Sequence, residues 1–129
     1  MQHPQNTTEF KDIINNSGDK IVIVKFGTTP CLKFVALAPE LEELAKEYAN
    51  NEKVVFASVD VDECAGASEE ASIASIPDTR FFIKGEDKAK VLGRNIVQIK
   101  KYLEKLIEFG EISVPKGEAV EGKVCGKGH

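Results

Sequence analysis

The stretch Phe26-Gly27-Thr28-Thr29-Pro30-Cys31-Leu32-Lys33-Phe34 joins the apolar run of residues 21–26, typical of a buried strand, to a pattern of helical spacing that begins near Cys31. A cysteine is thereby expected at the end of a strand and in the first turn of a helix. The first backbone N–H groups of a helix lack partners within it, and the helix dipole is positive there, so a thiolate at this position is stabilised. Cys31 is therefore the best nucleophile candidate in the chain.

The composition indicates one small domain. The chain has 129 residues, and 42% hydrophobic residues suffice for a single core. The net charge of -4, with lysine and arginine scattered, argues against binding to nucleic acid or a membrane and favours a protein or small-molecule partner. No run approaches the roughly 18 apolar residues of a membrane span, and the first residues lack the features of a secretion signal. We therefore expect a cytoplasmic protein.

Cysteine and histidine usage points the same way. The three cysteines, Cys31, Cys64 and Cys125, are odd in number and far apart, unlike the disulfide framework of a small secreted domain. A reducing compartment fits them better. The two histidines, His3 and His129, lie at opposite ends of the chain, so we expect no metal site.

Hydrophobic spacing predicts that helices and strands alternate. Helices are expected in a short segment after Asn6, in residues 31–50 with a bend at Pro39, in residues 67–74, and from Asn95 to about Gly110; strands are expected in residues 21–26, 53–59, 79–84 and 89–93, with a turn at 85–88. The first strand, helix and strand predict a right-handed crossover, whose ligands gather at the carboxyl ends of the strands. Residues 1–109 are expected to form the domain, and the glycine-rich residues 110–129 a flexible tail.

Several further segments carry a family resemblance. They are Gly18-Asp19-Lys20-Ile21-Val22-Ile23-Val24, Ala38-Pro39 with Leu41-Glu42-Glu43-Leu44-Ala45, Val59-Asp60-Val61-Asp62-Glu63-Cys64, and Ser75-Ile76-Pro77 followed by Phe81-Phe82-Ile83-Lys84-Gly85. On these residues the chain resembles the thioredoxins, most closely the cytosolic eukaryotic type, over residues 10–107. The resemblance implies an α/β thioredoxin fold in a single domain, with a central mixed sheet of four to five strands flanked by helices.

The resemblance also makes expectations about the site. It implies a cis peptide bond at Ile76–Pro77 that faces the active-site cysteine, and a substrate-binding edge that includes Pro30, Leu32, Ile76 and Pro77. The segment that could supply an extra N-terminal strand is short and polar. We therefore expect that strand to be weak or absent.

The chain departs from the family at the active site. Thioredoxins carry Trp-Cys-Gly-Pro-Cys where this sequence has Pro30-Cys31-Leu32-Lys33-Phe34, so the attacking cysteine is kept and Phe34 replaces the resolving one. Lys25 stands where the family buries an aspartate that assists proton transfer to the resolving cysteine. Asp78 stands where a threonine usually follows the cis proline. The two-thiol cycle is therefore broken after its first step.

The chemistry that remains is that of a single thiol. The helix start and the charge of Lys33 favour the thiolate of Cys31, and Lys25 adds to this if its amine reaches the site. Cys31 can then form a mixed disulfide, which glutathione, another protein thiol or a second cysteine of this chain must resolve. Cys125, in the predicted tail, is the candidate resolving residue, and the alternative is an exposed tail thiol with no partner. For Cys64 a packing role is favoured over a modification site.

Three functions stay open. The one we favour is a thioredoxin-like protein with a degenerate monothiol site, which forms mixed disulfides through Cys31 in thiol–disulfide exchange and cell redox homeostasis, as a weak or monothiol protein-disulfide oxidoreductase. The second is a redox-inactive binding module that holds a protein partner in the groove around Cys31 and Ile76–Pro77. The third is glutathione-dependent activity like that of monothiol glutaredoxins, including iron–sulfur cluster binding, although the glycine pair that binds glutathione is missing. No cofactor is expected, apart from glutathione as an external reductant, and the chain is expected to be a monomer, with a disulfide-linked dimer as the alternative.

Overall fold

The computed structural model describes residues 2–28 and 30–109. Its helices and strands follow in the order α1 (Thr7–Asn15), β1 (Ile21–Gly27), α2 (Leu32–Glu47), β2 (Val54–Asp60), α3 (Ala65–Glu70), β3 (Asp78–Ile83), β4 (Glu86–Leu92) and α4 (Ile96–Phe109). The strands form one sheet in the order β2-β1-β3-β4, in which β1 runs parallel to β2 and antiparallel to β3. The predicted single α/β domain with a mixed sheet is confirmed, with four strands among the described residues.

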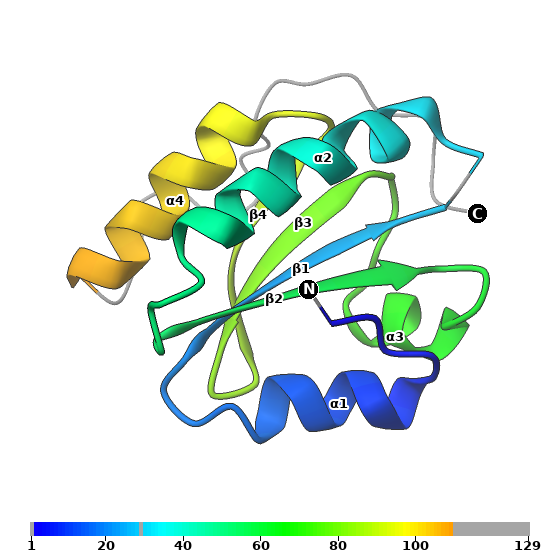
Figure 1. Ribbon diagram of the computed structural model, residues 1–129. Coiled ribbons are helices and arrows are strands. Elements are labelled where there is room, and N and C mark those ends of the chain that lie inside the picture. The colour runs from blue at the N-terminus through cyan, green and yellow to red at the C-terminus, as the bar shows by residue number, and fades with distance from the viewer. Residues whose placement is uncertain (1, 29, 110–129) are drawn as a thin grey trace.

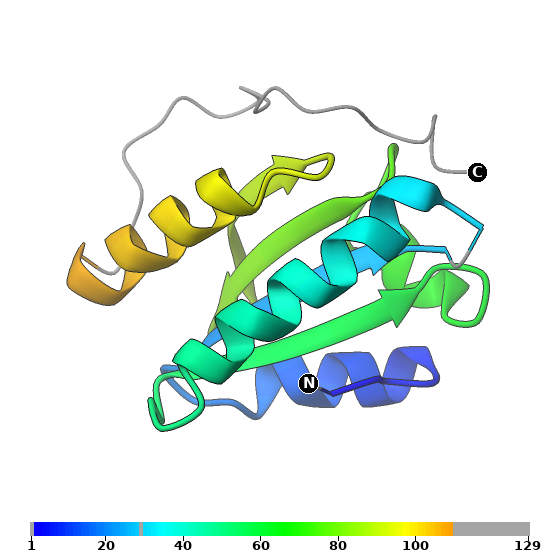
Figure 2. The same cartoon turned by 45° about the horizontal axis from the view of Figure 1, so that its top comes forward.

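The sheet is the middle one of three layers. Helices α2 and α4 cover one face, and α1 and α3 cover the other (Figure 1, Figure 2). Successive residues of β1 point to opposite faces of the sheet. Ile21 and Ile23 pack in the core under α2 and α4, whereas Val22, Val24 and Phe26 pack in the core under α1 and α3. This burial on both faces explains why residues 21–26 are almost entirely apolar.

The N-terminal segment contributes a bridge and a helix cap. Gln2 forms an isolated bridge to β2, in which its N–H donates to the Phe56 carbonyl (2.9 Å) and its carbonyl accepts from the Ser58 N–H (2.8 Å). The α1 helix then begins after Asn6, whose side chain accepts a hydrogen bond from the Glu9 N–H (2.9 Å). Among the described residues the N-terminal strand, expected to be weak or absent, is thus reduced to this bridge, and the short helix expected after Asn6 is present.

The predicted bounds of the short third helix are wrong. Residues 67–74 are expected to be helical, but α3 spans Ala65–Glu70. The helix cannot continue because Ser72 takes a φ of 56°, the left-handed conformation that commonly ends helices. The Ile73 N–H then donates back to the Ser68 carbonyl (2.9 Å). The chain is thereby redirected into the segment that leads to β3.

The hairpin between β3 and β4 is also tighter than expected. Its turn consists of Lys84 and Gly85, with φ of 54° and 80°, instead of residues 85–88. Two successive residues with positive φ match the twist of two antiparallel strands in a two-residue turn. As a result, β4 begins at Glu86, three residues before the predicted start at residue 89.

The last described element, α4, matches its prediction. The Asn95 side chain accepts a hydrogen bond from the Gln98 N–H (3.2 Å), and the helix runs to Phe109. Residues 110–129, expected to form a flexible tail, lie outside the described residues, and Cys125 lies among them. Within residues 2–28 and 30–109, no helix is both long enough and apolar enough to cross a membrane.

Candidate functional site

Cys31 lies between β1 and α2 and is the N-cap residue of α2. Its N–H donates to the Thr28 carbonyl (3.1 Å), and its own carbonyl accepts from the Val35 N–H in the first turn of α2 (3.0 Å). The residue is 5% exposed and disulfide-bonded. Cys31 is therefore at the positive end of the α2 dipole, where a thiolate is stabilised once the disulfide is reduced.

Phe34 lies in the first turn of α2, at the position where the resemblance predicts a resolving cysteine. Its ring lies so close to Gly27 that a Cβ at this glycine would overlap it, so the site requires glycine there. The Nζ atom of Lys25 lies 4.3 Å from the centroid of the same ring. A cation at this distance from a ring face is attracted to it. The ring thus occupies the space between β1 and the start of α2.

Lys25 is a buried cation next to this ring. It is 3% exposed and pairs across the sheet with Thr79 of β3, whose hydroxyl is buried and has no hydrogen-bond partner among the described residues. Burial lowers the pKa of Lys25, and the charge of Glu42 opposes this only in part. The charged form of Lys25 therefore lowers the free energy of unfolding, and replacing this residue tests that effect.

Replacing Lys25 by methionine is expected to stabilise the fold by about 1–2 kcal/mol at neutral pH, because a side chain of similar length stays while a buried charge is removed. The folded-state pKa of Lys25 lies below that of the unfolded chain. The stability of the parent should therefore rise with pH between the lowered pKa and the ordinary lysine pKa, and the variant should lack this rise. Urea unfolding across alkaline pH measures both, with exposed Lys20→Met as the control. A Lys25→Met variant less stable than the parent at every pH would contradict the assignment.

The predicted substrate edge lies beside β3. The Ile76–Pro77 peptide bond is cis, and the Pro77 carbonyl accepts a hydrogen bond from the Gly93 N–H (2.8 Å). Asp78 pairs with Phe26 of β1, so the register places Pro77 at the same end of the sheet as the segment that leads to Cys31. The structure therefore brings both halves of the predicted site to one sheet edge.

The exposure of the predicted edge residues differs. Pro30 is exposed and Leu32 is 80% exposed, while Lys33 is half-buried and both Ile76 and Pro77 are buried. Contact with a partner can therefore involve the side chains of the first two directly. At Ile76 and Pro77 most of the side chain is already covered by the domain.

A hollow of about 370 Å³ adjoins this edge. Its lining residues come from the loop after β2, from α3 and from the segment before β3, namely Val61, Asp62, Ala65, Ser68, Glu69, Ile73 and Ile76. It therefore combines an apolar lining with two carboxylates, next to the residue that precedes the cis proline.

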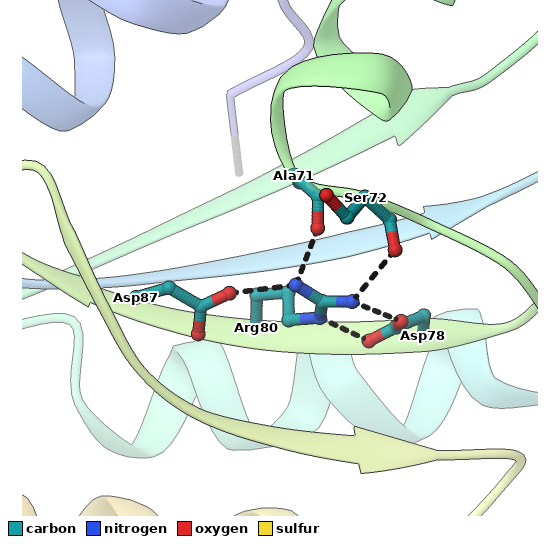
Figure 3. Close-up of polar contacts among 5 residues, drawn as sticks. All are labelled: Ala71, Ser72, Asp78, Arg80 and Asp87. Carbon is teal, nitrogen blue, oxygen red and sulfur yellow. Dashed lines mark hydrogen bonds and ion pairs between the residues drawn. The ribbon is translucent and has the colours of Figure 1, made fainter. Parts of the chain in front are cut away.

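Arg80 is an ionic centre that the sequence reasoning missed. Its guanidinium pairs with both carboxylate oxygens of Asp78 and reaches Asp87 of β4 (Figure 3). In the sequence, Asp78 stands out only as a departure from the family. Its spacing of two residues from Arg80 puts both on one face of a strand and could have indicated the pair. The contact with Asp87 depends on a shift in the register between β3 and β4, which the sequence pattern does not predict.

Cys64 is the free cysteine of the described residues. It is 1% exposed and lies in the apolar cluster under α1 and α3. Burial raises the pKa of its thiol. These observations support the packing role for Cys64.

Comparison with known proteins gives one family. The thioredoxin family model matches residues 2–105. The chain belongs to the thioredoxin family. Human thioredoxin is 29% identical over 103 residues, which are 80% of this chain and 95% of that protein. Sheep thioredoxin is 32% identical over 98 residues, which are 76% of this chain and 90% of that protein.

Solved thioredoxin structures agree with the fold. The thioredoxin of Plasmodium falciparum gives a TM-score of 0.74 at 32% identity, and that of Fasciola hepatica gives 0.76 at 26%; each comparison covers 81% of this chain and 98% of the other. Thioredoxins as a family carry out thiol–disulfide exchange with protein thiols and disulfides. In this thioredoxin, a cysteine stands at the start of α2, a cis proline at the sheet edge, and a phenylalanine three residues after the cysteine.

Proposed function

We propose that this chain is a thioredoxin with a degenerate, monothiol active site, in which Cys31 exchanges disulfides with protein partners. The observation that carries the proposal is the position of Cys31 as the N-cap of α2, with Phe34 in the first turn of the same helix. The attacking cysteine keeps the helix start that stabilises its thiolate. Phe34, which stands where a resolving cysteine would release the reduced partner, carries no thiol.

The exchange begins from reduced Cys31. Its thiolate attacks one sulfur of a partner disulfide, a new S–S bond forms to that sulfur, and the original S–S bond breaks. The other partner sulfur leaves as a thiolate and takes up a proton from water. Phe34 has no group that can attack this mixed disulfide, so a second thiol must complete the cycle.

We propose Cys125 as that second thiol. Cys31 is disulfide-bonded, whereas Cys64 is a buried free thiol. The sequence has one more cysteine, Cys125, which lies outside the described residues. Attack of the Cys125 thiolate on the Cys31 sulfur would release the partner as a thiol and leave a Cys31–Cys125 disulfide. Glutathione or another protein thiol would then reduce this disulfide, as expected in a cytoplasmic setting.

Mild oxidation of the reduced monomer is expected to produce a cross-linked pair of peptides that contain Cys31 and Cys125. Digestion without reductant, followed by mass spectrometry of the monomer fraction, detects the pair. The Cys125→Ser variant should lose the cross-link and accumulate a dimer joined through Cys31, whereas Cys64→Ser should keep it. If Cys31 and Cys125 never occur in one cross-linked species of the monomer, the internal pair is wrong.

The surface near Cys31 fits a protein partner. Leu32 is 80% exposed and Val35 is 47% exposed, and both lie in the first turn of α2. Exposed apolar side chains beside a reactive group are typical of contact surfaces. The hollow next to Ile76 offers further apolar contact. We therefore propose partners whose disulfide is flanked by apolar residues.

A redox-inactive binding module is the second candidate. It is favoured by the same exposed Leu32 and Val35, because these side chains can hold a partner without any exchange. An insulin-reduction assay with and without glutathione, combined with the alkylation rate of Cys31, separates the candidates. Slow alkylation and no turnover favour the binding module, whereas fast alkylation with adduct formation favours the monothiol thioredoxin.

A further inference from the structure

One guanidinium joins three parts of the chain on the sheet face that α1 and α3 cover. Arg80 is 6% exposed, and its Nε and Nη2 donate to the two carboxylate oxygens of Asp78 (2.8 Å each). Its Nη1 donates to the carbonyl of Ala71 and to Oδ2 of Asp87 (2.6 Å each), and its Nη2 donates to the carbonyl of Ser72 (3.4 Å). Figure 3 shows all five contacts. The five N–H groups of an arginine thus all have acceptors, as a buried guanidinium requires.

These contacts lie at both ends of one segment. Ala71 is the C-cap of α3 and Ser72 follows it, at the end of the helix where the last carbonyls lack partners and carry partial negative charge. Asp78 is the first residue of β3 and directly follows Pro77. The guanidinium of Arg80 therefore bridges the beginning and the end of the segment that contains the cis Ile76–Pro77 bond.

A β-bulge brings Asp87 to this bridge. Phe81 pairs with Ala89, but Phe82 pairs with Asp87, so Lys88 is an extra residue in β4. In an uninterrupted ladder Phe82 would pair with Lys88, and Asp87 would point to the other face of the sheet. The bulge thus places a carboxylate, instead of an ammonium group, beside the guanidinium, and it links the hairpin to the segment.

From this geometry we propose that Arg80 is a positioning residue for the partner-binding edge, holding the segment from Ser72 to Asp78 so that Ile76–Pro77 is presented to a protein partner. The role rests on the proposed function, in that a partner's disulfide-bearing segment binds at this edge. Arg80 acts through the segment and not on the sulfur. Loosening the segment therefore slows exchange with a peptide disulfide but not with a small disulfide, which needs only Cys31.

Arg80→Lys and Arg94→Lys form a matched pair of variants. At Arg80 the substitution keeps the positive charge that Asp78 needs but replaces a planar fork of donors by a single ammonium group. The Nε of Arg94 also donates to a carboxylate, that of Glu40, at 2.8 Å. This pair lies on the surface and is not part of the Arg80 network, although the neighbouring Gly93 bonds to Pro77. The two variants therefore make the same arginine-to-lysine change in an ion pair, once within the Arg80 network and once outside it.

Amide hydrogen exchange of the full-length, reduced protein gives the first readout. The N–H groups of Ile73 and Gly93 bond to the carbonyls of Ser68 and Pro77. In Arg80→Lys their exchange is expected to rise about tenfold or more, while the amides of β1 keep their parent rates, because the segment opens locally. Arg94→Lys should leave all of these rates unchanged. Unchanged exchange of Ile73 and Gly93 in folded Arg80→Lys would overturn the proposal.

Reaction rates give the second readout. Arg80→Lys should react with a small aromatic disulfide within about twofold of the parent, and with a peptide disulfide about fivefold or more slowly. Faster amide exchange with an unchanged peptide-disulfide rate would also overturn the positioning role. If the parent reacts with neither disulfide, the proposed function fails, and amide exchange alone decides whether Arg80 holds the segment. If Arg80→Lys does not fold, Asp78→Asn, which removes the charge that Arg80 binds at one end of the segment and keeps the side chain's size, is measured in its place, with the same outcomes deciding.

Discussion

Replacing Phe34 by cysteine is expected to raise the rate of insulin-disulfide reduction about tenfold or more, because a thiol three residues after Cys31 can attack the mixed disulfide from within the same molecule. Cys31 is the N-cap of α2 and Phe34 is its third residue, so the two are neighbours on the helix. In the parent, the Phe34 ring fills this place against Gly27 and Lys25. The substitution therefore supplies the second thiol that the two-thiol cycle lacks.

Phe34→Ser is the matched control for this gain. It removes the ring and leaves a side chain of nearly the size of cysteine, but without a thiol that can attack the mixed disulfide. It should reduce insulin no faster than the parent, and Cys31→Ser should abolish the gain in the Phe34→Cys background. The assay follows insulin precipitation with dithiothreitol as the reductant. Equal rates for Phe34→Cys and Phe34→Ser would show that Phe34 is not what closes the intramolecular route.

Replacing Arg80 by methionine is expected to lower the free energy of unfolding by about 3–5 kcal/mol at neutral pH, because it leaves a buried carboxylate without its counterion. That carboxylate belongs to Asp78, which is 1% exposed, and the carbonyl of Ala71 loses its donor as well. The exposed Arg94→Met variant breaks an ion pair of the same length and should cost less than about 1 kcal/mol. Urea unfolding measures both, and an equally small loss for Arg80→Met would contradict this account of the network.

The cost of losing Arg80 should also depend on pH. Burial raises the pKa of Asp78, and Arg80 opposes the rise, so the pKa climbs further when Arg80 is removed. A folded-state pKa above the unfolded one means that the folded chain binds more protons between the two values. Stability then falls as the pH rises through that window. The difference in the free energy of unfolding between Arg80→Met and the parent is therefore expected to shrink as the pH falls through this window.

The central strand and two of the helix starts could be predicted because each depends on residues that are close together in the sequence. Residues 21–26 are apolar in nearly every position, which suits a strand covered on both faces, and β1 is such a strand. Asn6 and Asn95 sit immediately before α1 and α4, where a side-chain oxygen accepts from a free N–H of the first turn. The place of Cys31 follows from the junction of this apolar strand with the helical spacing of residues 31–50.

The Arg80 network could not be predicted because it depends on tertiary pairing. Asp87 reaches Arg80 only through the extra residue Lys88. Residues 86–88 are all polar and exposed, so no hydrophobic alternation reveals the shift in register there. The early end of α3 depends in the same way on the left-handed conformation of Ser72, a residue that seldom adopts it. Both features involve residues that contact Arg80. The contacts that hold the segment from Ser72 to Asp78 are therefore harder to predict than the cis Ile76–Pro77 bond, which the resemblance implies.

The central claim, that Cys31 alone performs the first half of thiol exchange, is tested most directly on the Cys125→Ser variant. The reduced variant is mixed with a peptide disulfide, and intact-mass spectrometry and non-reducing peptide mapping follow the products. The account predicts an adduct of one peptide on Cys31 that persists until an external thiol is added, because Phe34 has no thiol and Cys64 is buried. No adduct, an adduct on Cys64, or an adduct that disappears without added thiol would contradict it.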